Sequence, residues 1–198
     1  MEILKVAEHA LAAVGAIASI LALFSFRIVK RMIGWREVTT LIRQLVGTIR
    51  QQDLAFDVVV GIRRSGAICA AMLAGNIGGL PVYTLNTRLR WRNVPAATGA
   101  QLMEADVDDG SAFPMLKDQR VLVVTCFNVT GVSPKVSMDY LQQFSPRSLT
   151  LLAMYESPQS QIRAALVGKP IAETTTERVL VGMPWMLSDS YQHPHLKR

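Results

Sequence analysis

The chain has 198 residues, of which 50% are hydrophobic and only 18% are charged. This length allows one domain with a sizeable core plus an appendage. Soluble domains carry roughly a quarter charged residues, so some of the apolar sequence is expected outside that core. The net charge of +6 favours an anionic partner, such as a phosphorylated small molecule, nucleic acid or lipid headgroups. Two isolated cysteines, Cys69 and Cys126, exclude a disulfide framework and a zinc site.

The first segment, 10–26, reads ALAAVGAIASILALFSF and carries no charged residue. About 20 apolar helical residues cross a hydrocarbon layer of about 30 Å, so the segment predicts a single transmembrane helix. Basic residues follow the segment and place the rest of the chain in the cytoplasm: Arg27, Lys30, Arg31 and Arg36. We therefore divide the chain into a membrane helix with a basic juxtamembrane segment (1–34), a cytoplasmic domain (35–190) and a polar tail (191–198).

Two alternatives for this segment stay open. A cleaved signal peptide carries its positive charge before the apolar run, whereas here the charge comes after it. A helix buried in a soluble core or in a homo-oligomer interface fits the small residues Gly15, Ala16 and Ser19, which allow close helix packing.

Helices and strands alternate in the first half of the domain. The sequence EVTTLIRQLVGTIRQQ (37–52) spaces its apolar residues by three and four, which predicts an amphipathic helix. FDVVVGI (56–62) is a continuous β-branched run typical of a buried parallel strand. The turn RRSG (63–66) follows, then a helix that ends near Gly78, and then the strand LPVYTLN (80–86). This order predicts an α/β domain with a parallel sheet.

The middle of the chain is less regular. Arginines alternate with Leu89 and Trp91 in TRLRWRN (87–93), so an extended backbone would place them on one basic edge. Such a strip can bind single-stranded nucleic acid. A solvated edge is the simpler interpretation, because the strip has only four basic or aromatic residues: Arg88, Arg90, Trp91 and Arg92. The acidic residues in 104–109 match no metal-binding loop spacing.

Further strands and helices are predicted in the second half. VLVV (121–124), SLTLLAMY (148–155) and RVLVGMPW (178–185) have the apolar character of strands. Between them, SPKVSMDYLQQF (133–144) and QIRAALVG (161–168) are predicted to be helices.

Two of the predicted strands lead into turns rich in small residues. The first is part of FDVVVGIRRSGAICAAMLAGNIGGLPV (56–82), and the second is part of VLVVTCFNVTGVS (121–133). With these motifs in this order, the chain resembles the type I phosphoribosyltransferases, especially the purine-type branch, over about residues 35–185. The resemblance implies a Rossmann-like parallel-sheet domain. The family's enzymes join a nitrogenous base to the ribose of phosphoribosyl pyrophosphate and release pyrophosphate, with Mg²⁺ as a helper.

The resemblance also implies two anion-binding turns. The turn after the first strand would bind pyrophosphate, because a helix N-terminus and arginines both attract anions; its residues are Arg63, Arg64, Ser65 and Gly66. The turn after the second strand would bind the 5′-phosphate, because small residues let the backbone N–H groups approach it; its residues are Thr130, Gly131, Val132 and Ser133. A plain tight turn with solvated arginines is the simpler alternative for the first.

The chain departs from the family at acidic positions. The family reads V-V-D-D-x-x-x-T-G-x-T, and here Thr125 and Cys126 stand at the paired acids, with Val129 at a third acidic position. These side chains cannot accept charge-assisted hydrogen bonds or attract a hard cation as carboxylates do. The run GMPW resembles the family's F-P-W-E, which implies a base-site region at Met183, Pro184 and Trp185.

Three functions therefore remain open. The first is a membrane-anchored sensor or effector that binds phosphoribosyl pyrophosphate or a nucleotide with weak or no transferase activity. The second is an active phosphoribosyltransferase for a purine-like base, with Mg²⁺ as cofactor and with acids such as Asp106 or Asp108 supplied by the middle segment. The third is a membrane scaffold without a ligand.

Overall fold

The computed structural model describes residues 27–93, 101–107, 113–171 and 177–185. These residues belong to two compact units, a larger one formed by Arg36–Ala172 and a smaller one that combines residues from the two ends of the chain. The apolar segment 10–26 and the tail 191–198 lie outside the described residues. Within the part of the chain that the structure describes, no helix has the length and apolar character needed to cross a membrane.

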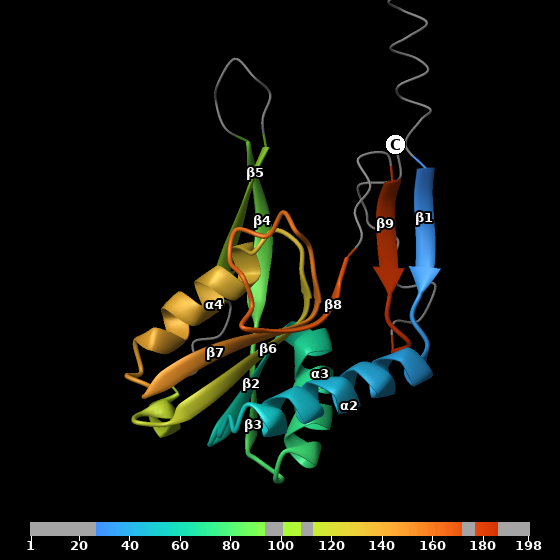
Figure 1. Ribbon diagram of the computed structural model, residues 1–198. Coiled ribbons are helices and arrows are strands. Elements are labelled where there is room, and N and C mark those ends of the chain that lie inside the picture. The colour runs from blue at the N-terminus through green and yellow to red at the C-terminus, as the bar shows by residue number, and fades with distance from the viewer. Residues whose placement is uncertain (1–26, 94–100, 108–112, 172–176, 186–198) are drawn as a thin grey trace, which may run out of the picture. The chain divides into compact units, whose positions relative to one another are not determined.

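A five-stranded parallel sheet forms the centre of the larger unit, in the order β3-β2-β6-β7-β8 (Figure 1). The strands are β2 (Val58–Ile62), β3 (Val82–Leu85), β6 (Arg120–Asn128), β7 (Ser148–Glu156) and β8 (Leu166–Pro170). Every residue of β2 is buried, as expected for a β-branched run covered on both faces. The predicted parallel-sheet α/β architecture is confirmed.

Three α-helices cover the two faces of this sheet: α2 (Trp35–Gln51), α3 (Arg63–Asn76) and α4 (Val132–Gln142). The crossover through α3 leads from β2 to β3, and the crossover through α4 leads from β6 to β7 in the opposite direction along the sheet. Because such crossovers are right-handed, α3 and α4 lie on opposite faces (Figure 1). A short 3-10 helix, Pro114–Leu116, precedes β6.

The helices α3 and α4 each cover an apolar layer on one face of the sheet. On the α4 side, Leu141 packs with alternate residues of the central strands, including Val60 and Val123. On the α3 side, Cys69 and Leu73 are fully buried. The helix α2 buries a stripe at spacings of three and four, as its sequence predicts: Val38, Leu41, Ile42, Leu45, Val46 and Ile49.

The middle segment forms an antiparallel hairpin of β4 (Thr87–Asn93) and β5 (Gln101–Val107). Its register places Arg88 opposite Asp106 and Arg90 opposite Glu104. Opposite charges on directly paired residues stabilise a sheet, so Arg88 lies on a strand whose partner carries an acid at the paired position. The sequence pattern had left a solvated basic edge and a nucleic-acid-binding strip open and did not reveal the acidic partner strand.

The prediction of a helix over 161–168 is wrong. The structure has an irregular segment followed by β8, which extends the sheet beside β7. A Cβ atom at Gly168 would lie 2.6 Å from the carbonyl oxygen of Met154, so the backbone approaches its neighbour too closely for a larger residue. Pairing with a strand end that is distant in sequence therefore outweighs the local helical pattern.

The smaller unit contains a parallel pair of strands, β1 (Arg27–Met32) and β9 (Glu177–Gly182). The residues predicted as a basic juxtamembrane segment thus include a strand, which begins at Arg27 paired with Glu177. The predicted last strand, 178–185, is confirmed as β9 but ends at Gly182 and pairs outside the five-stranded sheet. In the same unit the rings of Trp35 and Trp185 lie 5.6 Å apart.

An ion pair ties the amino ends of β2 and β6. The guanidinium of Arg120 donates to both carboxylate oxygens of Asp57, at 2.6 Å from Nη2 and 3.0 Å from Nε, and the Arg120 backbone N–H donates at 2.8 Å. The Arg120 side chain, followed by its backbone N–H, lowers the pKa of Asp57 from 3.8 to about 2.

This ion pair predicts an acid-sensitive contribution to stability. Because the folded pKa of Asp57 lies below its unfolded value, the contribution is present above about pH 4 and is lost as the pH falls toward 2. The difference in unfolding free energy between wild type and Asp57→Asn should shrink across this window in urea denaturation series. Arg120→Gln keeps the backbone hydrogen bond to Asp57, so it should reduce the pH dependence of the unfolding free energy less than Asp57→Asn does. If the unfolding free energies of wild type and Asp57→Asn changed in parallel with pH, the predicted contribution of the ion pair would be contradicted.

Candidate functional site

The sheet changes winding direction between β2 and β6. These neighbouring strands pair from Val58 with Val121 to Gly61 with Val124, and their crossovers leave in opposite directions. In open α/β sheets, ligands bind in the crevice outside the carboxyl ends of the strands at such a switch point. The two turns selected from the sequence follow these two strands, so the structure brings both to the same edge of the sheet.

The first turn is the N-terminus of α3. The helix begins at Arg63, so RRSG forms its first turn; the prediction that this motif precedes the helix is wrong. Arg63 has φ +59°, a left-handed conformation that costs a non-glycine residue roughly 1–2 kcal/mol. A Cβ atom at Gly66 would lie 2.6 Å from the carbonyl oxygen of Val124, so this turn rests directly on the middle of β6.

No side chain caps the N-terminus of α3, and its first turn contains no acidic residue. Helix N-termini carry partial positive charge and prefer acidic residues, but α3 has the exposed Arg63 and Arg64 there. The two arginines add positive charge to this helix end, so the turn favours an anion.

The second turn leads from β6 into α4. Gly131 is the N-cap residue of α4 and has φ +83°, and no side chain caps this helix either. The Val132 N–H lies 3.5 Å from the Thr130 hydroxyl oxygen, which is a long contact. The first turn of α4 also lacks an acidic residue. Both helices that begin at the switch point therefore have N-termini suited to an anion.

The three positions where the family resemblance implies acids differ in environment. Thr125 is buried, and its hydroxyl donates to the Phe127 carbonyl oxygen at 3.1 Å. Cys126 is buried against α3, where a hydrogen bond with Cys69, together with burial, raises the pKa of its thiol. Val129 is 43% exposed at the turn itself. The first two side chains are thus engaged within the protein.

These donor groups do not fit a magnesium ion, which prefers carboxylate and other hard oxygen ligands. A thiol, an apolar side chain and a hydroxyl already used for a backbone hydrogen bond occupy the three positions. Elsewhere among the described residues, no three His, Cys, Asp or Glu side chains are placed to hold a metal ion.

A buried polar cluster that the sequence does not reveal lies beside the second turn. Asn128 and Glu156 end β6 and β7, pair directly in register, and join through a hydrogen bond of 2.7 Å. Ser160 donates to Asn128 at 2.8 Å. In the sequence, Asn128 and Glu156 are visible only as polar residues that end apolar strands. That pattern does not show that the two residues pair with each other.

The predicted base-site residues belong to the smaller unit. Met183 is fully buried, and Pro184 and Trp185 are half-buried. Their role in base recognition stays a prediction.

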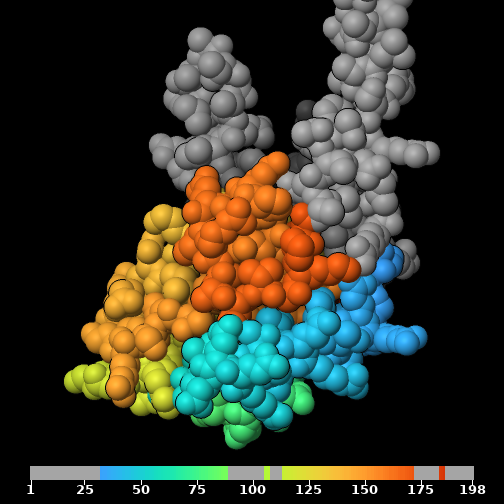
Figure 2. Space-filling view, in the orientation of Figure 1, coloured from blue at the N-terminus to red at the C-terminus, as the bar shows by residue number. Residues whose placement is uncertain are grey.

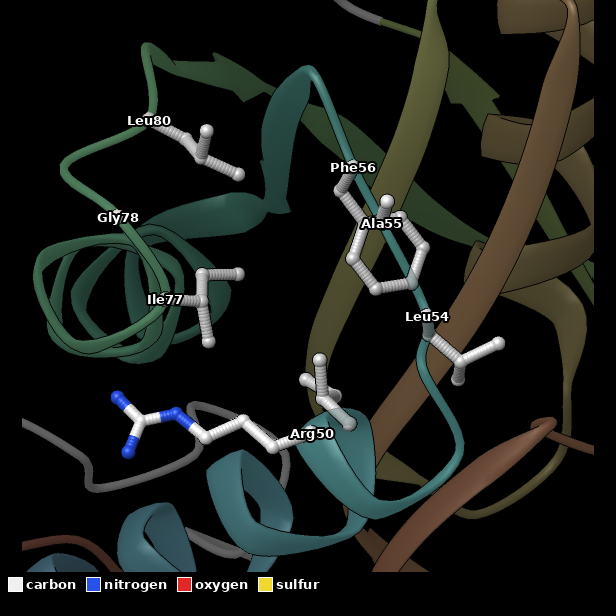
Figure 3. A pocket seen from close by; sticks show the side chains of 8 residues that line it. Arg50, Leu54, Ala55, Phe56, Ile77, Gly78 and Leu80 are labelled. Carbon is white, nitrogen blue, oxygen red and sulfur yellow. The ribbon is translucent and has the colours of Figure 1, made fainter.

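A separate pocket of about 390 Å³ lies at the amino end of the sheet (Figure 3). Its lining residues are Ile49, Arg50, Leu54, Ala55, Phe56, Ile77, Gly78 and Leu80. The Arg50 guanidinium donates to the Asn76 carbonyl oxygen at 2.9 Å and so connects the ends of α2 and α3. The lining contains no acid, histidine or nucleophile, so the pocket carries no catalytic group.

Neither a protein-family model nor a curated protein sequence matches the chain. Solved structures do match. Purine phosphoribosyltransferase from Pyrococcus horikoshii Ot3 has a TM-score of 0.59 and 18% identity, covering 80% of this chain and 94% of its own. Xanthine-guanine-hypoxanthine phosphoribosyltransferase from Helicobacter pylori has a TM-score of 0.58 and 17% identity, covering 79% and 93%.

The chain has the fold of the purine phosphoribosyltransferases. A hypothetical protein from Neisseria gonorrhoeae with bound ppGpp is also similar, with a TM-score of 0.67 and 18% identity over 82% of this chain and 92% of that one. The structural similarity to these proteins confirms the phosphoribosyltransferase fold that the sequence motifs implied. The roles of the individual residues in both turns stay predictions.

Proposed function

We propose that this protein binds a phosphoribosyl compound or a nucleotide and acts as a sensor or effector with weak or no transferase activity. One observation carries the proposal. Two uncapped helix N-termini without acidic residues begin from adjacent strands at the switch point of a phosphoribosyltransferase fold. Two anion-binding turns at one sheet edge suit a ligand with a phosphate at each end of a ribose.

The missing carboxylates support binding without turnover. Acids at Thr125 and Cys126 would hold the ribose hydroxyls, and an acid at Val129 would assist proton transfer, if the family pattern applied. Substrate orientation and electrostatic stabilisation of the transition state would both be weakened without them. The anion-binding turns depend on backbone N–H groups and arginines, so binding does not require these acids.

The similarity to the ppGpp-bound protein supports a charged nucleotide as one ligand class. A panel for this chain should therefore contain phosphoribosyl pyrophosphate, ppGpp and purine mononucleotides.

An active transferase is the second candidate. The exposed Asp106 on β5 is the described acid that such an enzyme would use in place of the acids missing from the second turn. Mg²⁺ would be its expected cofactor.

Calorimetry and a turnover assay test these functions together. We expect heat of binding for at least one member of the panel and pyrophosphate release, with purine bases present, no faster than that of a Gly131→Asp variant, which blocks the second turn. Turnover well above that variant would establish the transferase instead. No binding to any member of the panel would favour a scaffold without a ligand.

We also propose that residues 10–26 anchor the protein in a membrane with the phosphoribosyltransferase-like domain in the cytoplasm. The uncharged apolar run and the basic residues after it support this orientation. Full-length protein should sediment with membranes and need detergent for release. Recovery in the supernatant after high-speed centrifugation without detergent would contradict it.

A further inference from the structure

A buried carboxylate lies beside the second turn. Glu156 is 7% exposed and Asn128 is fully buried, and they face each other at the carboxyl ends of β7 and β6. The Asn128 Nδ2 donates to Glu156 Oε1 at 2.7 Å. Burying a carboxylate is unfavourable unless it receives hydrogen bonds or an ion pair. The groups that satisfy Glu156 therefore indicate what it holds in place.

These groups belong mainly to the 157–165 segment, which connects β7 to β8 and contributes to the surface of the larger unit (Figure 2). The Ala164 N–H donates to Glu156 Oε1 at 2.8 Å, and Arg163 Nη1 lies 3.5 Å from Oε2. Arg163 also donates to the carbonyl oxygens of Ser157 and Pro158, at 3.0 and 2.6 Å. Glu156 thus fixes the end of the segment at Ala164 and also holds Arg163, which bonds back to the start of the segment.

Asn128 fixes the middle of the same segment. Its Nδ2 also donates to the Ile162 carbonyl oxygen at 2.8 Å, and its Oδ1 accepts from the Ser160 hydroxyl at 2.8 Å. The Ser157 N–H donates to the Asn128 carbonyl oxygen at 2.9 Å. The segment is therefore held at its start, middle and end by two residues of the sheet.

The held segment packs directly on the second turn. The Gln161 N–H donates to the Thr130 carbonyl oxygen at 3.1 Å. A Cβ atom at Gly131 would lie 2.8 Å from the Ile162 nitrogen and 2.9 Å from both the Gln161 nitrogen and the Ser160 hydroxyl oxygen. The turn that begins α4 therefore takes its conformation against a wall formed by residues 160–162.

We propose that Glu156 and Asn128 are positioning residues for the phosphate that binds at the second turn. They hold the 157–165 segment against Gly131 and so fix the direction of the N–H groups at the start of α4. This inference rests on the proposed function. The first turn of α3 rests on Val124 and Thr125 instead, so the effect should be confined to one of the two anion-binding turns.

Calorimetry with two separate probes, ribose 5-phosphate and pyrophosphate, tests this on the full chain. Glu156→Ala should weaken ribose 5-phosphate binding about tenfold or more, because a hydrogen bond to a charged group contributes about one to two powers of ten in an equilibrium constant. Pyrophosphate binding should change less than about twofold. Glu156→Gln retains an oxygen that accepts from Asn128 and Ala164, so it should restore most of the lost affinity.

A second, smaller substitution keeps the proposal testable if Glu156→Ala fails to fold. Ser160→Ala removes one hydroxyl from the wall and its bond to Asn128, and should weaken ribose 5-phosphate binding by about threefold to tenfold. Glu37→Ala is the matched control: Glu37 is a partly buried carboxylate that accepts from the Tyr155 hydroxyl and from Lys169 Nζ, both at 3.3 Å. It should lower stability without changing affinity for either probe.

The outcomes separate the two proposals. If wild type binds neither these probes nor the nucleotide panel, the proposed function fails, and this inference fails with it. If wild type binds ribose 5-phosphate and Glu156→Ala and Ser160→Ala bind it equally well, only this inference is overturned. Equal weakening of both probes in Glu156→Ala, in step with its loss of stability, would also overturn it, because the role would then be general folding stability.

Discussion

Gly131→Ala should destabilise the protein by about 2–5 kcal/mol and abolish phosphate binding at the second turn. Gly131 has φ +83°, a conformation that costs an alanine about 1–2 kcal/mol. The added methyl group would also lie 2.8–2.9 Å from two backbone nitrogens and the Ser160 hydroxyl oxygen. Backbone atoms cannot rotate away, so the turn must separate from the 157–165 segment. Urea denaturation measures the first effect and calorimetry with ribose 5-phosphate the second.

Gly47→Ala is the matched control for Gly131→Ala. Gly47 lies within α2, and a Cβ atom there would have no neighbour within 4 Å. The substitution should stabilise the protein by about 0.5–1 kcal/mol, because alanine loses less backbone entropy than glycine in a helix. If both variants changed stability alike, the special role of the Gly131 conformation would be refuted.

Gly66→Ala should destabilise the protein by about 1–3 kcal/mol and weaken binding of pyrophosphate. A Cβ atom at Gly66 would lie 2.6 Å from the Val124 carbonyl oxygen and 3.6 Å from the Thr125 Cα. The first of these distances is far below van der Waals contact, and the obstacle is backbone in a central strand. The first turn of α3 must therefore shift away from β6, which changes the position of Arg63, Arg64 and Ser65. Denaturation and calorimetry with pyrophosphate measure both effects.

Gly75→Ala, in the same helix, provides the comparison for Gly66→Ala. Its added methyl group would meet no atom within 4 Å, so we expect a gain of about 0.5–1 kcal/mol and unchanged pyrophosphate binding. A Gly66→Ala variant as stable as Gly75→Ala, with wild-type affinity, would show that α3 need not rest on β6.

The predicted elements that proved correct have strong local patterns. The helix α2 follows from apolar residues at spacings of three and four, and β2 follows from a continuous β-branched run. The two glycine-containing motifs after β2 and β6 were also visible in sequence, although RRSG forms the first turn of α3 and does not precede it. Residue patterns within about ten positions contain enough information for these features.

Features that depend on distant partners could not be predicted in this way. The segment 161–168 has a helical pattern, but pairing of Leu166 with Leu152 extends the sheet instead. The strand β1 pairs with β9, which lies about 150 residues later in the chain, and such pairing is not visible in a local sequence pattern. The positions 125 and 126 look equivalent in sequence, whereas the structure gives them different partners in the Phe127 carbonyl and the Cys69 thiol.

The amino-acid sequence by itself determined the α/β order, the basic and glycine-containing turns, and the absence of acids at positions 125, 126 and 129. Only the tertiary structure decided that both turns meet at one switch point, and that Asn128 and Glu156 hold the wall behind Gly131. The physical reason is register. Asn128 and Glu156 become neighbours only when two parallel strands pair in one alignment, and no local pattern specifies that alignment.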